Sequence, residues 1–144
     1  MNNMGGHDIE DFEVGMQASF AKTVTETDIV LFAGITGDNN PVHIDAEAAA
    51  GTIFKERIAH GMLSAGFISA VLGTRLPGPG CIYLSQSLKF LAPVKIGDTV
   101  RAVCKVTGLA PEKRRVTLQT TCYVKDKAVV EGEAVMMVGK RSTG

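Results

Sequence analysis

The spacing of apolar residues changes in the middle of the chain, and this change limits the folds that the chain can adopt. Residues 61–74 (GMLSAGFISAVLGT) carry apolar groups on nearly every side of a helix, which is typical of a helix buried all round. From residue 82 onward, apolar and polar residues instead alternate, which indicates antiparallel strands with one face in water. The four expected strands cover residues 82–90, 99–106, 115–124 and 128–139. We therefore predict an α+β fold in which a curved antiparallel sheet wraps around one long central helix.

The first half of the chain predicts a short strand followed by small helices. Residues 16–24 alternate as a strand does, and Thr25 can then cap a helix that Gly37 ends in a left-handed conformation. The segment 37–43 (GDNNPVH) is expected to be a loop, because its proline lacks an N–H and pushes the preceding asparagine out of helical geometry. Asp45 is expected to cap the next short helix. The four later strands are expected to form a meander.

Chain length predicts one domain. The 144 residues can bury a core that needs neither a disulfide nor a metal for stability. Residues 1–11 combine glycine, asparagine and acidic residues without a period, so we expect a frayed tail there and a single domain over 12–144. Because one sheet face and the sheet edges still need cover, we expect a homodimer or a higher homo-oligomer.

Charge balance and cysteine content argue against several classes of protein. The chain holds 15 basic and 15 acidic residues, so it lacks the basic excess with which nucleic-acid binders meet phosphates. Its three cysteines form no C-x-x-C pair, which argues against a disulfide framework or a zinc cage. A histidine, glycines and serines interrupt the apolar stretch 58–74, so no membrane span is expected. With no signal-peptide pattern at the start, these features indicate the cytoplasm.

The polar residues of the first half gather in one loop. Asp38 and His43 lie five residues apart, and Pro41 stiffens the chain between them. A carboxylate and an imidazole held in this way can bind one water and accept its proton near neutral pH. The same residues also make good turn chemistry, because aspartate and asparagine bond to their own backbone. Spacing alone favours the catalytic and the structural interpretation about equally.

A metal site is another chemistry that this region could support. The possible ligands are Asp38, His43, Asp45 and His60. However, Asp45 is already explained as a helix cap, and the set matches none of the close spacings of metal motifs. We therefore expect no bound metal, and we expect His60 to be a structural hydrogen-bonding residue.

Several ordered segments resemble one protein family. Residues 32–49 (FAGITGDNNPVHIDAEAA) are similar to the signature of the (R)-specific enoyl-CoA hydratase group of the MaoC-like hydratases. Further similar segments are 59–63 (AHGML), 76–80 (LPGPG), 82–100 (IYLSQSLKFLAPVKIGDTV) and 132–137 (GEAVMM). Together they cover most of the chain from Val14 onward.

The resemblance implies a fold, an assembly and a reaction. The fold is the hot-dog fold, in which a curved antiparallel sheet wraps a long helix. Members of the family are usually homodimers with the acyl-thioester site near the subunit interface. The reaction is the reversible addition of water to a trans-2-enoyl-CoA, which gives the (R)-3-hydroxyacyl-CoA. Coenzyme A is part of this acyl-CoA substrate, so no separate cofactor is implied.

The resemblance also implies roles for particular residues. Asp38 would take a proton from a water that His43 also holds, and His43 or the water's second proton would then supply the proton at C2. Gly61 opens the long helix, so its free N–H would face the charge on the thioester oxygen, and its missing side chain would let the thioester approach. Ser69, about two turns further on, would lie near the catalytic water, and Asn40 would help to bind substrate. A hydroxyl bonded to a backbone carbonyl explains Ser69 equally well.

Two other functions remain open at this point. A thioesterase on the same fold would also hold a water beside a carboxylate but would aim it at the thioester carbon. A non-enzymatic acyl-thioester-binding module is the second alternative, although its expected sign is a lost Asp38 or His43. The sequence leaves open the acyl chain length, the basic residues that face the CoA phosphates, and the pathway. That pathway could be polyhydroxyalkanoate synthesis, fatty-acid breakdown or the metabolism of a branched acyl-CoA.

Overall fold

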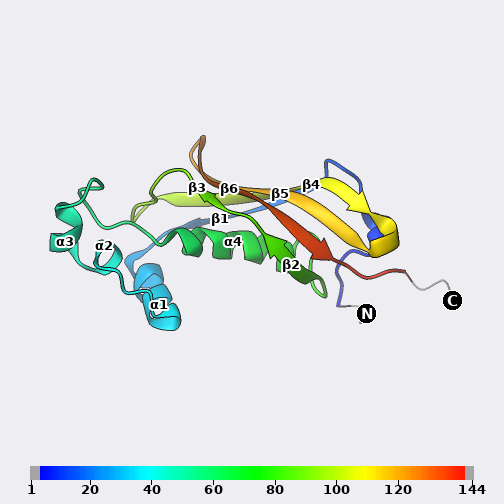
Figure 1. Cartoon of the computed structure of the whole chain (residues 1–144), viewed down its shortest axis with the longest axis horizontal. Helices are drawn as coiled ribbons and strands as arrows, with labels where there is room; N and C mark the ends of the chain where they lie inside the picture. The colour runs from blue at the N-terminus through cyan, green and yellow to red at the C-terminus, as the bar shows by residue number, and fades with distance from the viewer. Residues whose placement is uncertain (1–3, 142–144) are drawn as a thin grey trace.

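A six-stranded antiparallel sheet packed on one long helix dominates the computed structural model, which describes residues 4–141 (Figure 1). The strands are β1 (Gln17–Thr23), β2 (Ile82–Gln86), β3 (Lys89–Phe90), β4 (Thr99–Ala110), β5 (Arg115–Val124) and β6 (Lys127–Met137). The α-helices are α1 (Glu26–Thr36), α2 (Pro41–Ile44), α3 (Ala46–Ala50) and α4 (Gly61–Thr74), and short 3₁₀ turns lie at Ile9–Asp11 and Pro111–Lys113. No helix in the described chain is both long and apolar enough to cross a membrane.

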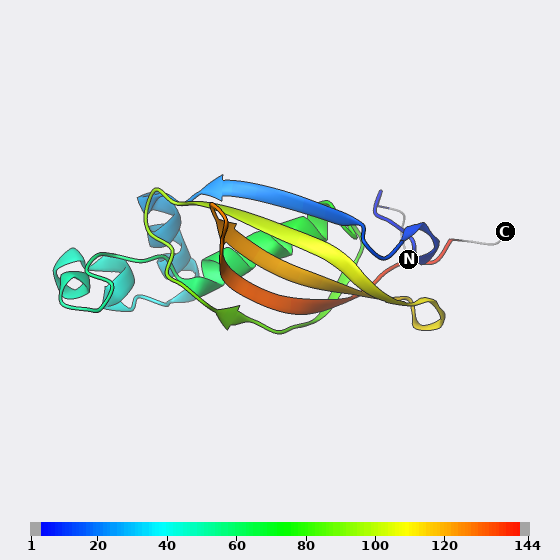
Figure 2. The ribbon, with the colours of Figure 1, turned by 90° about the horizontal axis from the view of Figure 1, so that it is seen from above.

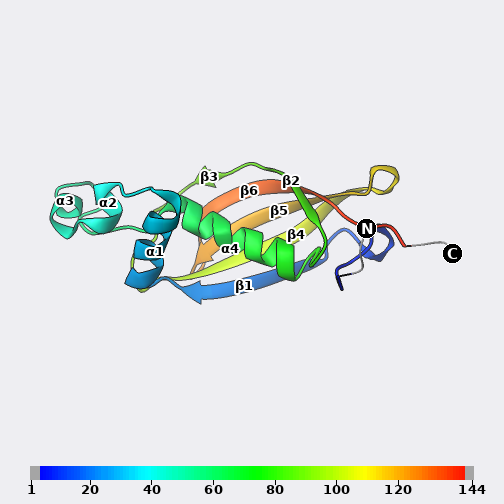
Figure 3. The ribbon, with the colours of Figure 1, turned by 90° about the horizontal axis from the view of Figure 1, so that it is seen from below.

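The helix α4 lies along one face of the sheet, as Figure 2 and Figure 3 show from opposite sides, and the buried core residues come from both elements. Ile68, Val71 and Leu72 of α4 are fully buried there. On β4, Val100 and Cys104 are also fully buried, while their neighbours point away from α4, so the alternation predicted for this strand is confirmed. Burying each such aliphatic side chain stabilises the fold by about 1.5–3 kcal/mol, which makes this contact the main source of stability.

The outer face of α4 differs from the prediction of a helix buried on all sides. Met62, Gly66, Ser69 and Gly73 form an exposed stripe along this helix. Their spacing of three to four residues places them on one face, opposite the sheet. Glycine and serine are small and nearly neutral in hydrophobicity, so the residue types did not separate this face from the buried one.

The strand order also corrects the expected meander. The order is β1-β4-β5-β6-β2, with β3 paired to β6 as well. Only β4, β5 and β6 are joined as consecutive hairpins, whereas β2 lies on the far side of β6. The reason is that β1 already occupies the free side of β4, with Gln17 opposite Lys105. The segment before β4 therefore has to pair at the other edge.

The start of the described chain is docked rather than frayed. Ile9 and Phe12 are each only 6% exposed and belong to the core. Ile9 N–H donates to Gly139 C=O at 2.8 Å, and Asp11 forms an ion pair with Arg141. The prediction of a frayed tail over 1–11 is therefore wrong for residues 8–11, and residues 1–3 lie outside the described chain.

The helices α1 to α3 lie beyond one end of the sheet, on the side where α4 begins, and α3 is the one farthest from α4 (Figure 1). The Thr25 side chain accepts from Asp28 N–H and caps α1, and the Asp45 side chain caps α3, as predicted. The segment 37–43 is not entirely a loop, because α2 begins within it. Asn40 caps α2 with its side chain, and Pro41 suits the first helical position, where a missing N–H costs no hydrogen bond.

Candidate active site

A cavity of about 410 Å³ lies beside the first turn of α4. Its polar lining comes from three segments, namely Asp38 after α1, His43 in α2, and His60, Gly61 and Ser64 at the start of α4. The remaining wall is mostly apolar and includes Phe54, Ile58, Met62, Phe90, Leu91 and Val94. A few polar groups at one side of an apolar cavity suit a ligand with a reactive polar group and an apolar tail.

Asp38 is placed by the end of α1. Gly37 ends that helix in the left-handed conformation with φ of 82°, so the chain turns sharply before the carboxylate. Asp38 N–H donates to Thr36 Oγ1 at 3.1 Å, and the Asp38 carboxylate accepts from Asn40 N–H at 3.4 Å. These local bonds fix the loop while leaving the Asp38 side chain exposed toward the cavity.

His43 is fixed as a proton acceptor. Its Nδ1–H donates to the Ile58 carbonyl at 2.7 Å. A carbonyl can only accept, so Nδ1 carries a hydrogen, and in the neutral form of the ring the lone pair lies on Nε2. Arg57 Nε donates to the His43 carbonyl at 2.7 Å, and the same guanidinium pairs with Glu26 at 2.7 Å. The backbone that carries this imidazole is therefore tied to both α1 and the segment before α4.

His60 touches both members of the Asp38–His43 pair. Its Nε2–H donates to the Asp38 backbone carbonyl at 2.7 Å. Its ring stacks on the His43 ring, with centroids 3.9 Å apart and planes inclined by 30°, and Phe32 packs on it at 4.7 Å. His60 is only 2% exposed. The expectation that this residue forms a structural hydrogen bond is confirmed.

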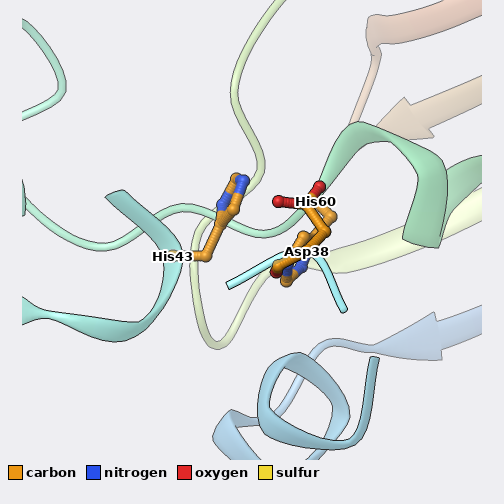
Figure 4. Close-up of side chains that lie close together, drawn as sticks. All are labelled: Asp38, His43 and His60. Atoms are coloured by element: carbon orange, nitrogen blue, oxygen red, sulfur yellow. The ribbon is translucent and has the colours of Figure 1, made fainter. Parts of the chain in front are cut away.

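The three side chains come together from three segments (Figure 4). One ligand atom from each of Asp38, His43 and His60 lies within 4.8 Å of the other two. This spacing would also permit a metal ion. Asp45 does not join them, because its carboxylate accepts from Glu47 N–H and Ala48 N–H at the start of α3. The absence of a bound metal at this site therefore stays a prediction.

Gly61 lies in the cavity wall at the first position of α4, where backbone N–H groups have no partner within the helix. We expected the space over its Cα to be open to the thioester, but the Phe90 ring occupies it. A Cβ added to Gly61 would lie 2.5 Å from two carbons of the Phe90 ring. The missing side chain therefore makes room for Phe90, which is 54% exposed at the cavity, rather than leaving an open approach for a thioester.

Two predicted residues do not reach this cavity. Ser69 lines a separate groove between α4 and β2, in which Met62 is the residue shared with the cavity. Asn40 is exposed, and its Oδ1 accepts from Val42 N–H at 3.2 Å to cap α2. The structure thus gives Asn40 a structural task, and it places Ser69 away from the Asp38–His43 pair within one chain.

Ser64 is a polar residue of the cavity that the sequence analysis missed. It lies four residues after His60, is 1% exposed and has a side-chain oxygen with no hydrogen-bond partner in the described chain. Its spacing from His60 could have revealed it, since residues four apart share a helix face. A serine within an apolar helix gave no other signal.

The cysteines do not supply a reactive thiolate. Burial raises the pKa of Cys104 to about 12, with a smaller contribution from nearby Cys122. Burial also raises the pKa of Cys122 to about 12 and raises the pKa of Cys81. All three are free thiols, and at neutral pH they stay protonated.

Comparison with known proteins gives consistent matches. The family described as "MaoC like domain" matches residues 11–133. An (R)-specific enoyl-CoA hydratase from Rhodospirillum rubrum is 64% identical over 135 residues, or 94% of each chain. The solved R-hydratase PhaJ1 from Pseudomonas aeruginosa has a TM-score of 0.89 at 47% identity and covers 94% of this chain and 88% of its own. The (R)-hydratase from A. caviae, described as involved in PHA biosynthesis, has a TM-score of 0.87 at 42% identity, covering 90% and 98%. These likenesses confirm the expected hot-dog fold.

Proposed function

Because the chain belongs to the family of proteins with a MaoC-like domain, we propose that it is an (R)-specific enoyl-CoA hydratase. This hydro-lyase adds water reversibly to a trans-2-enoyl-CoA and forms the (R)-3-hydroxyacyl-CoA. The observation that carries the proposal is that the Asp38 carboxylate and a ring nitrogen of His43 lie within 4.8 Å of each other at one cavity, while His43 Nδ1 is bonded to Ile58 C=O, which leaves Nε2 to accept. Two acceptors at this spacing suit the two O–H groups of one water.

Hydration requires a proton acceptor for the water. As the water oxygen attacks C3, one of its protons passes to Asp38 while His43 Nε2 holds the other O–H. Electrons move from the double bond toward the thioester oxygen, and an enolate forms. The proton held by the Asp38–His43 pair then returns to C2, which balances the addition. A positioned general base of this kind contributes about 100- to 10,000-fold to the rate.

The enolate oxygen needs hydrogen-bond donors. The helix α4 begins at Gly61 in the cavity wall, and its first free backbone N–H groups would donate to this oxygen. The positive end of the helix dipole lies at the same place and favours a developing negative charge. The apolar wall with Ile58, Phe90 and Leu91 would hold the acyl part and exclude bulk water.

One assay separates hydration from thioester hydrolysis and from binding without turnover. Purified protein is mixed with crotonyl-CoA, and the enoyl-thioester absorbance is followed together with free-thiol release. Loss of absorbance without thiol, with the (R) product resolved by chiral chromatography, supports the proposal. Thiol release would instead identify a thioesterase, and binding without any turnover would identify an acyl-thioester-binding module.

A homodimer completes this proposal. The edge strand β2, the short strand β3 and the residue after it carry apolar side chains that are 40% or more exposed, namely Ile82, Tyr83, Leu84, Phe90 and Leu91. Tyr83 and Leu84, together with the exposed face of α4, border the groove that contains Ser69, whereas Phe90 and Leu91 line the Asp38–His43 cavity. A second copy would cover this edge and bring that groove next to a neighbouring site.

Sedimentation velocity tests the dimer. We expect the wild-type protein to sediment as a dimer and Leu84→Arg to give monomers. The control Ile53→Arg, at an 87% exposed position outside the sheet, should stay dimeric.

Two further assignments follow as proposals. The (R)-hydratase from A. caviae is described as involved in PHA biosynthesis, and an (R)-3-hydroxyacyl-CoA made here would suit the same use. The three free cysteines support a reducing compartment such as the cytoplasm.

A further inference from the structure

Two buried polar side-chain atoms in the described chain have no hydrogen-bond partner, and both belong to the cavity. They are His60 Nδ1 and Ser64 Oγ. Buried polar atoms are nearly always paired, because an unpaired one loses its bonds to water without replacement. Their coincidence in one cavity therefore needs a common explanation.

The hydrogen-bond character of these two atoms is complementary. His60 Nε2–H donates to the Asp38 carbonyl at 2.7 Å, so the hydrogen of the neutral ring lies on Nε2 and Nδ1 carries a lone pair. Ser64 offers an O–H donor. His60 is the N-cap residue of α4, and Ser64 lies in the first turn of the same helix. The acceptor and the donor thus line the same cavity.

A fixed tautomer of His60 matters for the pair that it contacts. With the hydrogen on Nδ1 instead, the lone pair of Nε2 would face the lone pairs of the Asp38 carbonyl and repel them. The Asp38 loop would then lose its 2.7 Å bond to the start of α4, and the His43 ring stacked at 3.9 Å would lose its neighbour's fixed orientation. The tautomer of one buried ring therefore controls the geometry of both proposed catalytic groups.

We propose that Ser64 and His60 are positioning residues of the hydration site. The Ser64 hydroxyl acts on His60 Nδ1 through one enclosed water, which donates to Nδ1 and accepts from Ser64, and so keeps the hydrogen of His60 on Nε2. His60 in turn holds the Asp38 backbone and the His43 ring in place. This inference rests on the proposed hydratase activity for its kinetic consequence, but the tautomer of His60 can be measured without it.

The test compares four variants. Ser64→Ala should lower kcat about 10- to 100-fold with KM nearly unchanged, because a small displacement of Asp38 and His43 slows the chemical step rather than binding. His60→Gln, whose amide N–H can still reach the Asp38 carbonyl, should keep more activity than His60→Leu, which has no donor. Thr74→Ala is the matched control, since it removes a hydroxyl at the far end of the same helix, where Thr74 Oγ1 donates to Ala70 C=O at 2.6 Å.

Nitrogen-15 NMR of the His60 ring supplies the readout that a merely structural role would not move. The wild-type ring should show a protonated Nε2 and an unprotonated Nδ1, and Ser64→Ala should mix the two tautomers while circular dichroism and Tm show a folded protein. A wild-type kcat together with an unchanged His60 tautomer in Ser64→Ala would overturn the inference. A wild-type protein that fails to hydrate crotonyl-CoA would refute the proposed function instead, and the NMR result would still decide whether Ser64 fixes His60.

Discussion

The helix α4 is held in two different ways along its length. Its middle and second half face the sheet through aliphatic side chains such as Ile68 and Leu72. These two side chains are fully buried and carry no polar group. Its first turn instead meets α1 and α2 through hydrogen bonds and ring stacking, centred on His60. The first contact is spread over many interchangeable methyl groups, whereas the second depends on a few directed bonds. We therefore expect substitutions on the sheet side to change stability and those at the first turn to change activity.

The comparison is tested most strongly by Asp38→Asn. The amide cannot take a proton from water, so we expect kcat for crotonyl-CoA hydration to fall by about 100- to 10,000-fold. Because the Asp38 side chain is exposed and bonds only to its own loop, Tm should change little. His43→Gln serves as the companion variant and should lose activity to a similar extent. Full activity in either variant would contradict the assigned chemistry.

The opposite result is expected for Leu72→Ala on the sheet side of α4. Leu72 is fully buried, and its truncation leaves a cavity in the core. We expect the free energy of unfolding to fall by about 2–5 kcal/mol, measured by urea denaturation. The kcat of the folded fraction should stay within about twofold of wild type, because Leu72 is not part of the polar contacts at the first turn of α4. A large loss of kcat without a loss of stability would erase the distinction between the two regions.

Gly61→Ala tests the boundary between the two regions. The added Cβ would overlap the Phe90 ring at 2.5 Å, so the ring must turn away from the start of α4. We expect KM for crotonyl-CoA to rise and kcat to fall, together by about 10-fold, since the cavity wall moves by a fraction of an ångström. The same substitution in a Phe90→Ala background should cost less. Equal losses in both backgrounds would show that the clash is not the cause.

The smallest expected effect concerns acid stability near α1. The Lys22 ammonium bonded to Asp28, together with the Thr25 bonds, holds the pKa of the Asp28 carboxyl below its usual value. A lowered folded-state pKa stabilises the fold above the unfolded pKa of about 4, and this contribution is lost as pH falls through the lower folded pKa. Asp28→Asn should therefore cost at most about 1 kcal/mol at pH 7 and progressively less below pH 4. Denaturation midpoints across this pH range, with activity as the control, measure it.

Local features of this chain were predictable from sequence, because their causes lie within a few residues. Thr25, Gly37 and Asp45 end or begin helices through bonds to their immediate neighbours, and each lies where the pattern predicted. The pair Asp38 and His43 was also found in this way, since one short loop carries both.

Long-range features could not be predicted in the same way. The pairing of β2 with β6 depends on β1 having filled the side of β4, a competition between segments that are distant in sequence. The docking of Ile9 depends on residue 139, at the other end of the described chain. Ser64 escaped notice because its importance comes from the unpaired nitrogen of His60, which only the three-dimensional structure reveals.

The contact between the two ends of the described chain has a practical consequence. Residues 8–11 bond to residues 139 and 141, and both ends leave the molecule at the opposite end from α1, α2 and the cavity (Figure 1). A second enzyme fused at either end, or a surface to which the protein is tethered there, would leave the cavity mouth unobstructed. An enzyme that consumes the hydroxyacyl thioester could be joined to this chain by a flexible linker while the catalytic end stays open to substrate.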